Sequence, residues 1–280
     1  MILGFLGKGG SGKSTVATLM SRHLHTAGKT VLAVDADHNM DLAYNLGYDG
    51  NGPYIGGTFL PLRNQFGLND TEPTERIFTK SAPDVRFSFT KPDAYSAEYV
   101  HQLSERLYLM MSGPQHELVL HGAHCSHSLA APLKVYLPLL KLAPDEVVVV
   151  DEKASVDAVS TGIPTGFDLA VVVTEPRVHS LRSGKQIAEM LDWYGVPRIV
   201  VLNKHKSAAD VEAFTEVFGE TPFATLPATL DQDAANAETE RALATIAVEA
   251  AQEAKKSETG RLERTVAKYR RNEEFQRTVA

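Results

Sequence analysis

One short stretch near the amino terminus constrains this chain more than any other part of it, namely Gly7-Lys8-Gly9-Gly10-Ser11-Gly12-Lys13-Ser14-Thr15. Gly7, Gly12, Lys13 and Ser14 fit the spacing G-x-x-x-x-G-K-[S/T] at every position. Three residues between Gly7 and Lys13 are themselves glycines, so backbone N–H groups can converge on phosphate oxygens there, next to the positive N-terminus of the following helix. The sequence therefore predicts a phosphate-binding loop over residues 7–15.

The flanking residues give this loop the context it needs. The apolar run 1–6 predicts a strand, and residues 16–20 continue as a helix with an apolar stripe, which is the strand–loop–helix arrangement of such loops. We expect Lys13 to reach the β- and γ-phosphates of ATP or ADP and Ser14 to offer its hydroxyl to Mg²⁺. The alternative, a glycine-rich turn without a ligand, is disfavoured by this context.

Composition limits the remaining possibilities. The chain has 280 residues, 43% of them hydrophobic, enough for one sizeable α/β domain. The net charge of −7 gives no general attraction to nucleic acid or anionic lipid. The single cysteine excludes an intrachain disulfide framework, and neither an N-terminal signal nor an 18-residue apolar span is recognised, so we expect a cytoplasmic protein.

Further apolar runs predict the strands of one sheet, at 30–35, 106–111, 146–151, 169–174, 198–202 and 222–226. Helical periodicity is expected at 129–142, 180–194 and 231–256. Residues 48–104 are interrupted by glycine and proline and are predicted to form an irregular insertion. This pattern predicts the fold class as α/β, a doubly wound and predominantly parallel sheet of the P-loop NTPase type.

Polar side chains follow several of these strands. The carboxyl ends of strands in such a sheet face the ligand, so we expect Asp37 to lie beside the γ-phosphate and position the attacking water. Asp151 ends the strand 146–151 and is predicted to hold Mg²⁺, through a water. Asn203 and Lys204 end another strand, and an amide there can pair with the adenine edge.

Lys8 adds a cation where an ordinary phosphate-binding loop requires none, and the stretch resembles the deviant Walker A motif, K-G-G-x-G-K-[S/T]. In families with that motif the early lysine reaches the partner's phosphates in a nucleotide-sandwich dimer. The resemblance therefore implies an ATP-dependent homodimer with Lys8, Lys13 and Asp37 as its catalytic residues. Alternatively, Lys8 is only a solvated loop charge.

The resemblance extends to the strand ends. Asp35-Ala36-Asp37-His38-Asn39 looks like the D-x-D-P-N switch I of MinD, ParA and CooC-type ATPases, with His38 in place of the CooC-type proline. His38 is either a functional addition or a surface histidine. Residues 152–157 resemble the CooC-type switch II, D-T-E-A-G-I-E, but Lys153 replaces its glutamate and Ser155 its glycine. Asn203-Lys204 resembles the base-contacting N-K pair.

Four of the ten histidines and the only cysteine fall between positions 116 and 127. Residues 122–128 look like the CooC-type G-x-x-C-x-C-P motif with His127 in place of the second cysteine. Cys125 and His127 would project to one side of an extended loop, and the same pair from two subunits would give the four ligands that Zn²⁺ or Ni²⁺ can accept. The alternatives are an intrachain site completed by His121 or His124, or surface histidines around a small buried Cys125.

The last residues differ in charge from the rest. Seven Lys/Arg against two Glu between positions 255 and 271 give +5, and Leu262, Val266 and Tyr269 share one helical face. We therefore expect an ATPase domain over residues 1–256 and a basic helical tail over 257–280. A solvated terminal helix is the default for the tail, because its apolar face is thin for a membrane anchor.

Taken in order, these motifs most resemble a CooC-type maturation ATPase. That resemblance implies an ATP-hydrolysing dimeric switch that delivers a metal such as nickel to a client metalloenzyme, with no nucleic-acid partner and with membrane binding disfavoured. The alternative is a MinD- or ParA-like spatial regulator, in which the same switch acts on a membrane or on a DNA-bound partner.

Overall fold

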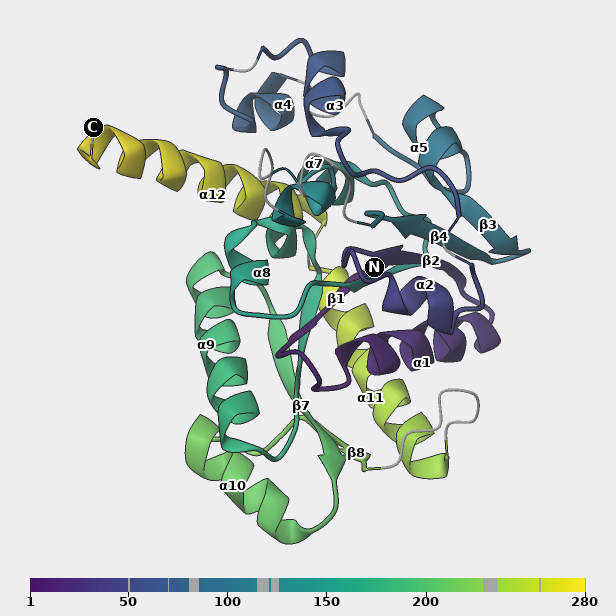
Figure 1. The fold of residues 1–280 in the computed structure, drawn as a ribbon, viewed down its shortest axis with the longest axis vertical. Coiled ribbons are helices and arrows are strands. Elements are labelled where there is room, and N and C mark those ends of the chain that lie inside the picture. Colours follow the sequence, from purple (N-terminus) through teal and green to yellow (C-terminus); the bar gives the residue numbers. More distant parts are fainter. Residues whose placement is uncertain are drawn as a thin grey trace.

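An eight-stranded sheet runs through the molecule in the order β3-β4-β2-β5-β1-β6-β7-β8 (Figure 1). The computed structural model describes residues 1–49, 51–69, 71–80, 86–114, 121, 126–228, 236–256 and 258–279. All neighbouring strands are parallel except β3 and β4, which are antiparallel. The predicted fold class, a doubly wound and predominantly parallel sheet, is confirmed.

The central strands are the apolar runs that the sequence predicted. Every residue of β1 (Ile2–Gly7), β2 (Thr30–Asp35), β5 (Glu146–Asp151) and β6 (Leu169–Thr174) is buried, as expected for parallel strands with helices on both faces. The bounds of β4 (Leu107–Met111), β7 (Arg198–His205) and β8 (Ala224–Pro227) differ from the predicted ranges by one to three residues. Asn203 and Lys204 consequently belong to β7 itself.

Two apolar layers, one on each face of the sheet, lie between the strands and the helices. Leu3 and Phe5 of β1 pack with α1 (Lys13–Thr26), α2 (Asp41–Asn45) and α11 (Ala237–Ala254). Ile2 and Leu6 face the opposite layer, which contains α7 (Leu133–Leu139), α9 (Val178–Tyr194) and α10 (Ala208–Phe218). Each fully buried large side chain contributes about 1.5–3 kcal/mol, so the two layers fix the sheet that carries the loops.

The predicted insertion contains short helices, α3 (Phe59–Gln65), α4 (Glu75–Lys80) and α5 (Ala94–Tyr99), and one strand that the sequence analysis missed, β3 (His101–Ser104). β3 is a half-exposed edge strand, and its four mostly polar residues give too short an alternation to recognise. Asp93 caps α5 by accepting from the N–H groups of Tyr95 and Ser96.

The helix predicted at 129–142 is wrong at both ends. A short 3₁₀ turn, η1 (Ser126–Ala130), comes first, and α7 begins after Pro132 and contains Pro138 in its last turn. Proline is tolerated at a helix start but removes an internal hydrogen bond further along, which limits α7 to seven residues. α8 (Asp157–Ser160) and η2 (Ile163–Gly166) lie between β5 and β6. For the helix predicted at 231–256, residues 231–235 lie outside the described residues.

The predicted C-terminal helix is confirmed as α12 (Glu258–Val279), but the expectation that it is solvated is wrong for its first half. Arg261, Thr265 and Lys268 are buried, and Leu262 and Val266 pack against the apolar layer of the sheet. This half of α12 is buried through polar side chains whose partners are themselves buried. A search for apolar periodicity does not detect such a helix face. The second half of α12 projects from the body of the molecule (Figure 1).

Candidate nucleotide site

The glycine-rich loop joins β1 to α1 at the carboxyl edge of the sheet. Gly10 and Gly12 have φ angles of 83° and 89°, and residues other than glycine rarely adopt such angles. A Cβ atom on Gly7 would lie 2.4 Å from the Val173 carbonyl oxygen, and one on Gly12 would lie 2.2 Å from Asn203 Nδ2. Glycine is therefore required at both motif positions. The Ser11 hydroxyl is buried without a partner among the described residues, so this loop has a polar group available for a ligand.

The end of β7 holds this loop in place. Asn203, which is buried, donates from Nδ2 to the Ser11 carbonyl over 2.8 Å, and its Oδ1 accepts from the Lys204 N–H over 2.9 Å. The Lys204 ammonium donates to the Gly10 carbonyl and to Glu175 Oε2, the latter over 2.9 Å. Both predicted nucleotide-binding residues thus contact the loop, while the contact of Asn203 with adenine stays a prediction.

Lys13 forms a buried ion pair with Asp151, donating to its Oδ1. Burial lowers the pKa of Lys13, but the charge and hydrogen bond of Asp151, together with the charges of Asp37 and Asp35, outweigh burial and raise the pKa overall. The strand register places Asp35 directly beside Asp151. The predicted phosphate-binding lysine therefore lies among the carboxylates at the carboxyl ends of β2 and β5.

Asp35 and Asp37 organise the segment after β2. Asp35 accepts from the N–H groups of Asp37 (3.1 Å) and Ala43 (3.0 Å). Burial, followed by the charge of Asp151, raises the pKa of Asp35 well above its usual range. Asp37 Oδ1 accepts from the Asn39 N–H over 3.2 Å and lies 3.2 Å from Nδ1 of the partly exposed His38. His38 thus contacts the predicted water-positioning residue. This contact is compatible with both interpretations of His38, a functional addition and a surface histidine.

The donor set beside Lys13 fits Mg²⁺. The buried Asp151 Oδ2 has no hydrogen-bond partner among the described residues, and Ser14 Oγ lies 3.3 Å from Lys13 Nζ. Burial raises the pKa of Asp151, while Lys13 and then the Ser14 hydroxyl lower it, and burial prevails. A carboxylate and a hydroxyl are the hard oxygen donors that Mg²⁺ prefers, so Ser14 and Asp151 are suited to hold it.

Glu152 is a buried acid that sequence analysis did not identify. Its Oε2 accepts from the Lys153 N–H over 3.3 Å, and its Oε1 has no partner among the described residues. Burial raises the pKa of Glu152 to about 8. The sequence signal that could have identified Glu152 as a buried acid is its position directly after Asp151, at the end of a buried strand.

Two more residues near the loop had no predicted role. Ser155, at the position of a glycine in the CooC-type switch II, has a φ of 110°, and its N–H donates to the Gly7 carbonyl over 3.1 Å. Glu175, directly after β6, holds Lys204. Both come from segments next to the loop in space but distant in the sequence.

The remaining predicted residues lie in different surroundings. Lys8, Gly9 and Gly10 are exposed, and Ser14 and Thr15 are half-buried in the first turn of α1. Cys125 lies outside the described residues, and the structure places only the backbone of His127, in η1. Within the described part of the chain, no group of three or more His, Cys, Asp or Glu side chains could hold a metal ion, so the proposed Cys125/His127 site stays a prediction.

The sequence matches the CbiA family, the CobQ/CobB/MinD/ParA nucleotide binding domain, over residues 4–272. The chain belongs to this family of P-loop nucleotide-binding proteins, and the predicted resemblance to the MinD/ParA class is confirmed.

Similar proteins agree with this assignment. An uncharacterised ATP-binding protein of Methanocaldococcus jannaschii is 28% identical over 205 residues, covering 73% of this chain and 78% of that protein. The carbon monoxide dehydrogenase accessory protein CooC of Rhodospirillum rubrum is 26% identical over 219 residues, covering 75% and 77%. The septum site-determining protein MinD of Pyrococcus horikoshii, solved with Mg-ADP, superposes with a TM-score of 0.51 at 20% identity, covering 95% of this chain and 93% of that one.

Proposed function

We propose that this protein binds and hydrolyses ATP with Mg²⁺. The observation that carries the proposal is the position of Lys13, buried at the glycine-rich loop and paired with Asp151 beside Asp35 and Asp37. Phosphoryl transfer needs charge neutralisation, a metal ion and a positioned water more than covalent chemistry. Lys13, Ser14 with Asp151, and Asp37 supply residues suited to these three tasks.

Each residue then has a distinct role. The Lys13 ammonium exchanges its contact with Asp151 for the β- and γ-phosphate oxygens of the nucleotide. The carboxylate of Asp151 would thereby become available to hold Mg²⁺. The Ser14 hydroxyl, at the start of α1, would be a second oxygen donor to the same ion. Asp37, fixed by its N–H bond to Asp35, orients the water that attacks the γ-phosphate. Bound Mg²⁺ supplies charge neutralisation of the phosphates.

The switch works through a homodimer, which is typical of the MinD/ParA class. The exposed position of Lys8 is compatible with contact to a partner's phosphates, where a second cation would balance the charge of ATP better than that of ADP. In this proposal ATP favours the dimer and hydrolysis releases it.

For the cellular role we propose a CooC-like factor that delivers a metal, with nickel as first candidate, to a client metalloenzyme. The relationship to CooC at 26% identity supports this role. Membership in the MinD/ParA class supports the alternative equally, a regulator acting on a membrane or a DNA-bound partner.

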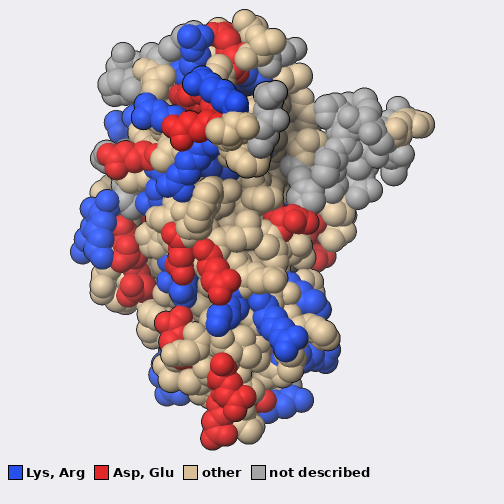
Figure 2. Space-filling view, turned by 90° about the vertical axis from the view of Figure 1, so that its left-hand side faces the viewer, with Lys and Arg blue, Asp and Glu red and all other residues tan. Residues whose placement is uncertain are grey.

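One feature of α12 weighs against the alternative. Arg261 pairs with the buried Asp168, Arg264 and Lys268 donate to the carbonyls of Phe167 and Thr161, and Arg271 donates to that of Trp193. Four of the basic groups of the tail are thus engaged within the molecule. On the face in Figure 2, basic and acidic side chains are intermixed, which is not the single-sign surface that attracts phosphate backbones. Among the described residues, no helix is long and apolar enough to cross a membrane.

Catalysis is tested with Asp37→Asn, which should retain binding of Mg-ATP and lose steady-state phosphate release. A variant as active as the parent would remove Asp37 from the mechanism. Dimerisation is tested by light scattering with saturating Mg-ATP in the Asp37→Asn background, where Lys8→Ala should remain monomeric. Exposed Lys141 gives the matched control, Lys141→Ala, which should still dimerise.

The metal role is tested by titrating Zn²⁺ and Ni²⁺ with ADP and with a non-hydrolysable ATP analogue. If Cys125 and His127 bind metal across the dimer, the analogue must raise metal affinity, and metal must favour the dimer by the same free energy. Unchanged metal stoichiometry in both Cys125→Ser and His127→Ala would reject this site and leave ATP hydrolysis untouched.

A further inference from the structure

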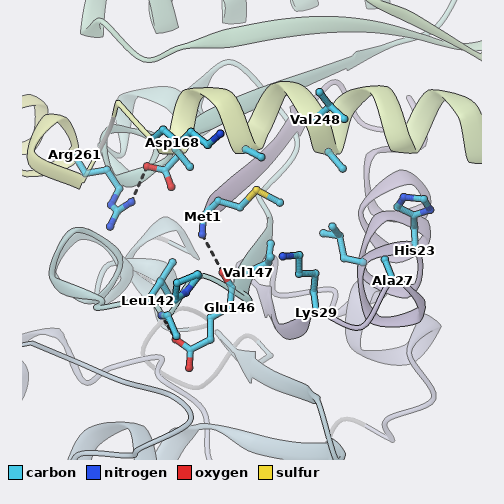
Figure 3. Close-up of a pocket in the computed structure, with 17 residues that line it drawn as sticks. Met1, His23, Ala27, Lys29, Leu142, Glu146, Val147, Asp168, Val248 and Arg261 are labelled. Carbon is cyan, nitrogen blue, oxygen red and sulfur yellow. Dashed lines mark hydrogen bonds and ion pairs between the residues drawn. The ribbon is translucent and has the colours of Figure 1, made fainter.

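A cavity of 520 Å³ opens at the amino edge of the sheet, opposite the glycine-rich loop (Figure 3). It lies between the end of α1, the start of β5 and helix α11, with Met1 at its centre. The volume is that of a site for a small organic molecule. The nucleotide site uses none of these residues.

The wall of this cavity is aliphatic. Leu24, Leu142, Val147, Val248 and Ala251 line it, and no lining residue has a hydroxyl or amide side chain or a phenyl, phenol or indole ring. Along this wall a sugar would meet no hydroxyl or amide side chain, and the only aromatic ring among the described lining residues is the imidazole of His23. Val248 is 58% exposed because it faces this opening, so the wall suits an alkyl chain.

The charged groups around the cavity are unevenly satisfied. Asp168 accepts from the Ile2 N–H (2.7 Å) and pairs with Arg261 (2.6 Å). Glu146 accepts from the Thr90 hydroxyl and, over 2.8 Å, from the Ala143 N–H. Both carboxylates are therefore occupied within the protein.

The cations keep unused donors. Arg261 is buried, and its Nε has no partner among the described residues. Lys29 and Lys255 also line the cavity. Burial lowers the pKa of the Met1 amino group to about 6, so the positive charge at neutral pH comes from these three side chains. An anionic group is the complement of this arrangement.

We propose that the cavity binds an aliphatic carboxylate, with its chain along the wall from Leu24 to Val248 and its carboxylate near Lys29, Lys255 and Arg261. The aliphatic wall and the excess of donors each point to this ligand class, and a neutral alkyl chain would add no acceptor for Lys29, Lys255 or the Nε of Arg261.

The test is calorimetric titration of the full chain with decanoate, octanoate, hexanoate and decanol, all below their aggregation concentrations. Decanoate should bind at one saturable site. Each methylene removed should weaken binding about three- to fourfold, the value of one buried CH₂. Decanol should bind at least tenfold more weakly than decanoate. Absence of saturable binding, or equal binding of decanol, would overturn the proposal.

Variants locate the site. Ala251→Trp and Val248→Trp should each abolish decanoate binding by filling the cavity, whereas Gln252→Trp, on the same helix but outside the lining, should not. Replacing Lys29 and Lys255 together by alanine should weaken binding about tenfold, from two partly exposed charge contacts, while Lys256→Ala leaves it unchanged. Decanoate binding that survives in both tryptophan variants, with circular dichroism confirming their fold, would place the ligand elsewhere.

Discussion

Replacing Glu152 by glutamine should stabilise this protein increasingly as the pH rises. The folded-state pKa of Glu152 is about 8, against an ordinary value of 4.5, because the carboxyl group is buried. At pH 7 an unfolded chain carries the ionised group, so folding must return a proton to it at a cost of about 3 kcal/mol. Glutamine has the same shape and no such cost.

The pH dependence has a definite sign. A raised acid pKa contributes stability that is fully present below the unfolded value of 4.5 and is lost as the pH rises through the folded value of about 8. Over that interval the free energy of unfolding of the parent should fall, relative to the variant, by about 1.4 kcal/mol per pH unit. The difference should reach about 5 kcal/mol above pH 8.5. An amide without a second partner subtracts a constant of about 1 kcal/mol.

The assay is urea unfolding of parent and Glu152→Gln at half-unit steps from pH 5.5 to 8.5, with equal slopes confirming comparable denatured states. Glu105→Gln is the matched control, since Glu105 is exposed and its carboxylate meets water in both states. A difference between parent and Glu152→Gln that does not vary with pH would show that Glu152 is not held protonated, and the reasoning would fail.

Three further variants test other contacts. Gly12→Ala should weaken ATP-analogue binding at least tenfold in a fluorescence titration, because its Cβ would lie 2.2 Å from Asn203 Nδ2; unchanged affinity would contradict the need for this close approach. Asp168→Asn should lower the free energy of unfolding by about 3–5 kcal/mol, since it leaves the buried Arg261 charge unpaired, and a loss under 1 kcal/mol would mean that water reaches this pair. Ser155→Gly should raise the free energy of unfolding by about 0.5–1 kcal/mol, because glycine adopts this left-handed backbone conformation without strain. A variant less stable than the parent would show that the backbone of Ser155 is not strained.

The sequence was sufficient for the central sheet and the glycine-rich loop. The valine-rich run at 146–151 is typical of a strand buried on both faces, and β5 has those bounds. The roles predicted for Lys13 and Ser14 rest on a spacing that constrains the backbone directly. The structure places both beside Asp151, the carboxylate predicted at the end of the strand 146–151.

What the sequence could not supply depends on contacts between distant segments. Asn203 holds the loop through Ser11, which lies 192 positions away, and no local pattern encodes that bond. The buried side of α12 was missed because Arg261 and Lys268 count as exposed in any hydropathy pattern. Their burial follows from partners such as Asp168, which only the folded chain brings within reach.

The segment directly after Asp151 contains two features that destabilise the folded protein. Glu152 is held protonated at a cost of about 3 kcal/mol at pH 7, and Ser155 has a left-handed backbone at a further cost of about 1–2 kcal/mol. Such strain persists only where the surrounding structure imposes it, and here buried β5 holds one end while the bond from the Ser155 N–H to the Gly7 carbonyl holds the other. A glycine at position 155, as in the switch II pattern that this segment resembles, would remove the backbone part. Serine keeps this cost in the folded protein, so a rearrangement of residues 152–157 that relaxed the Ser155 backbone would require less free energy than the same rearrangement with glycine.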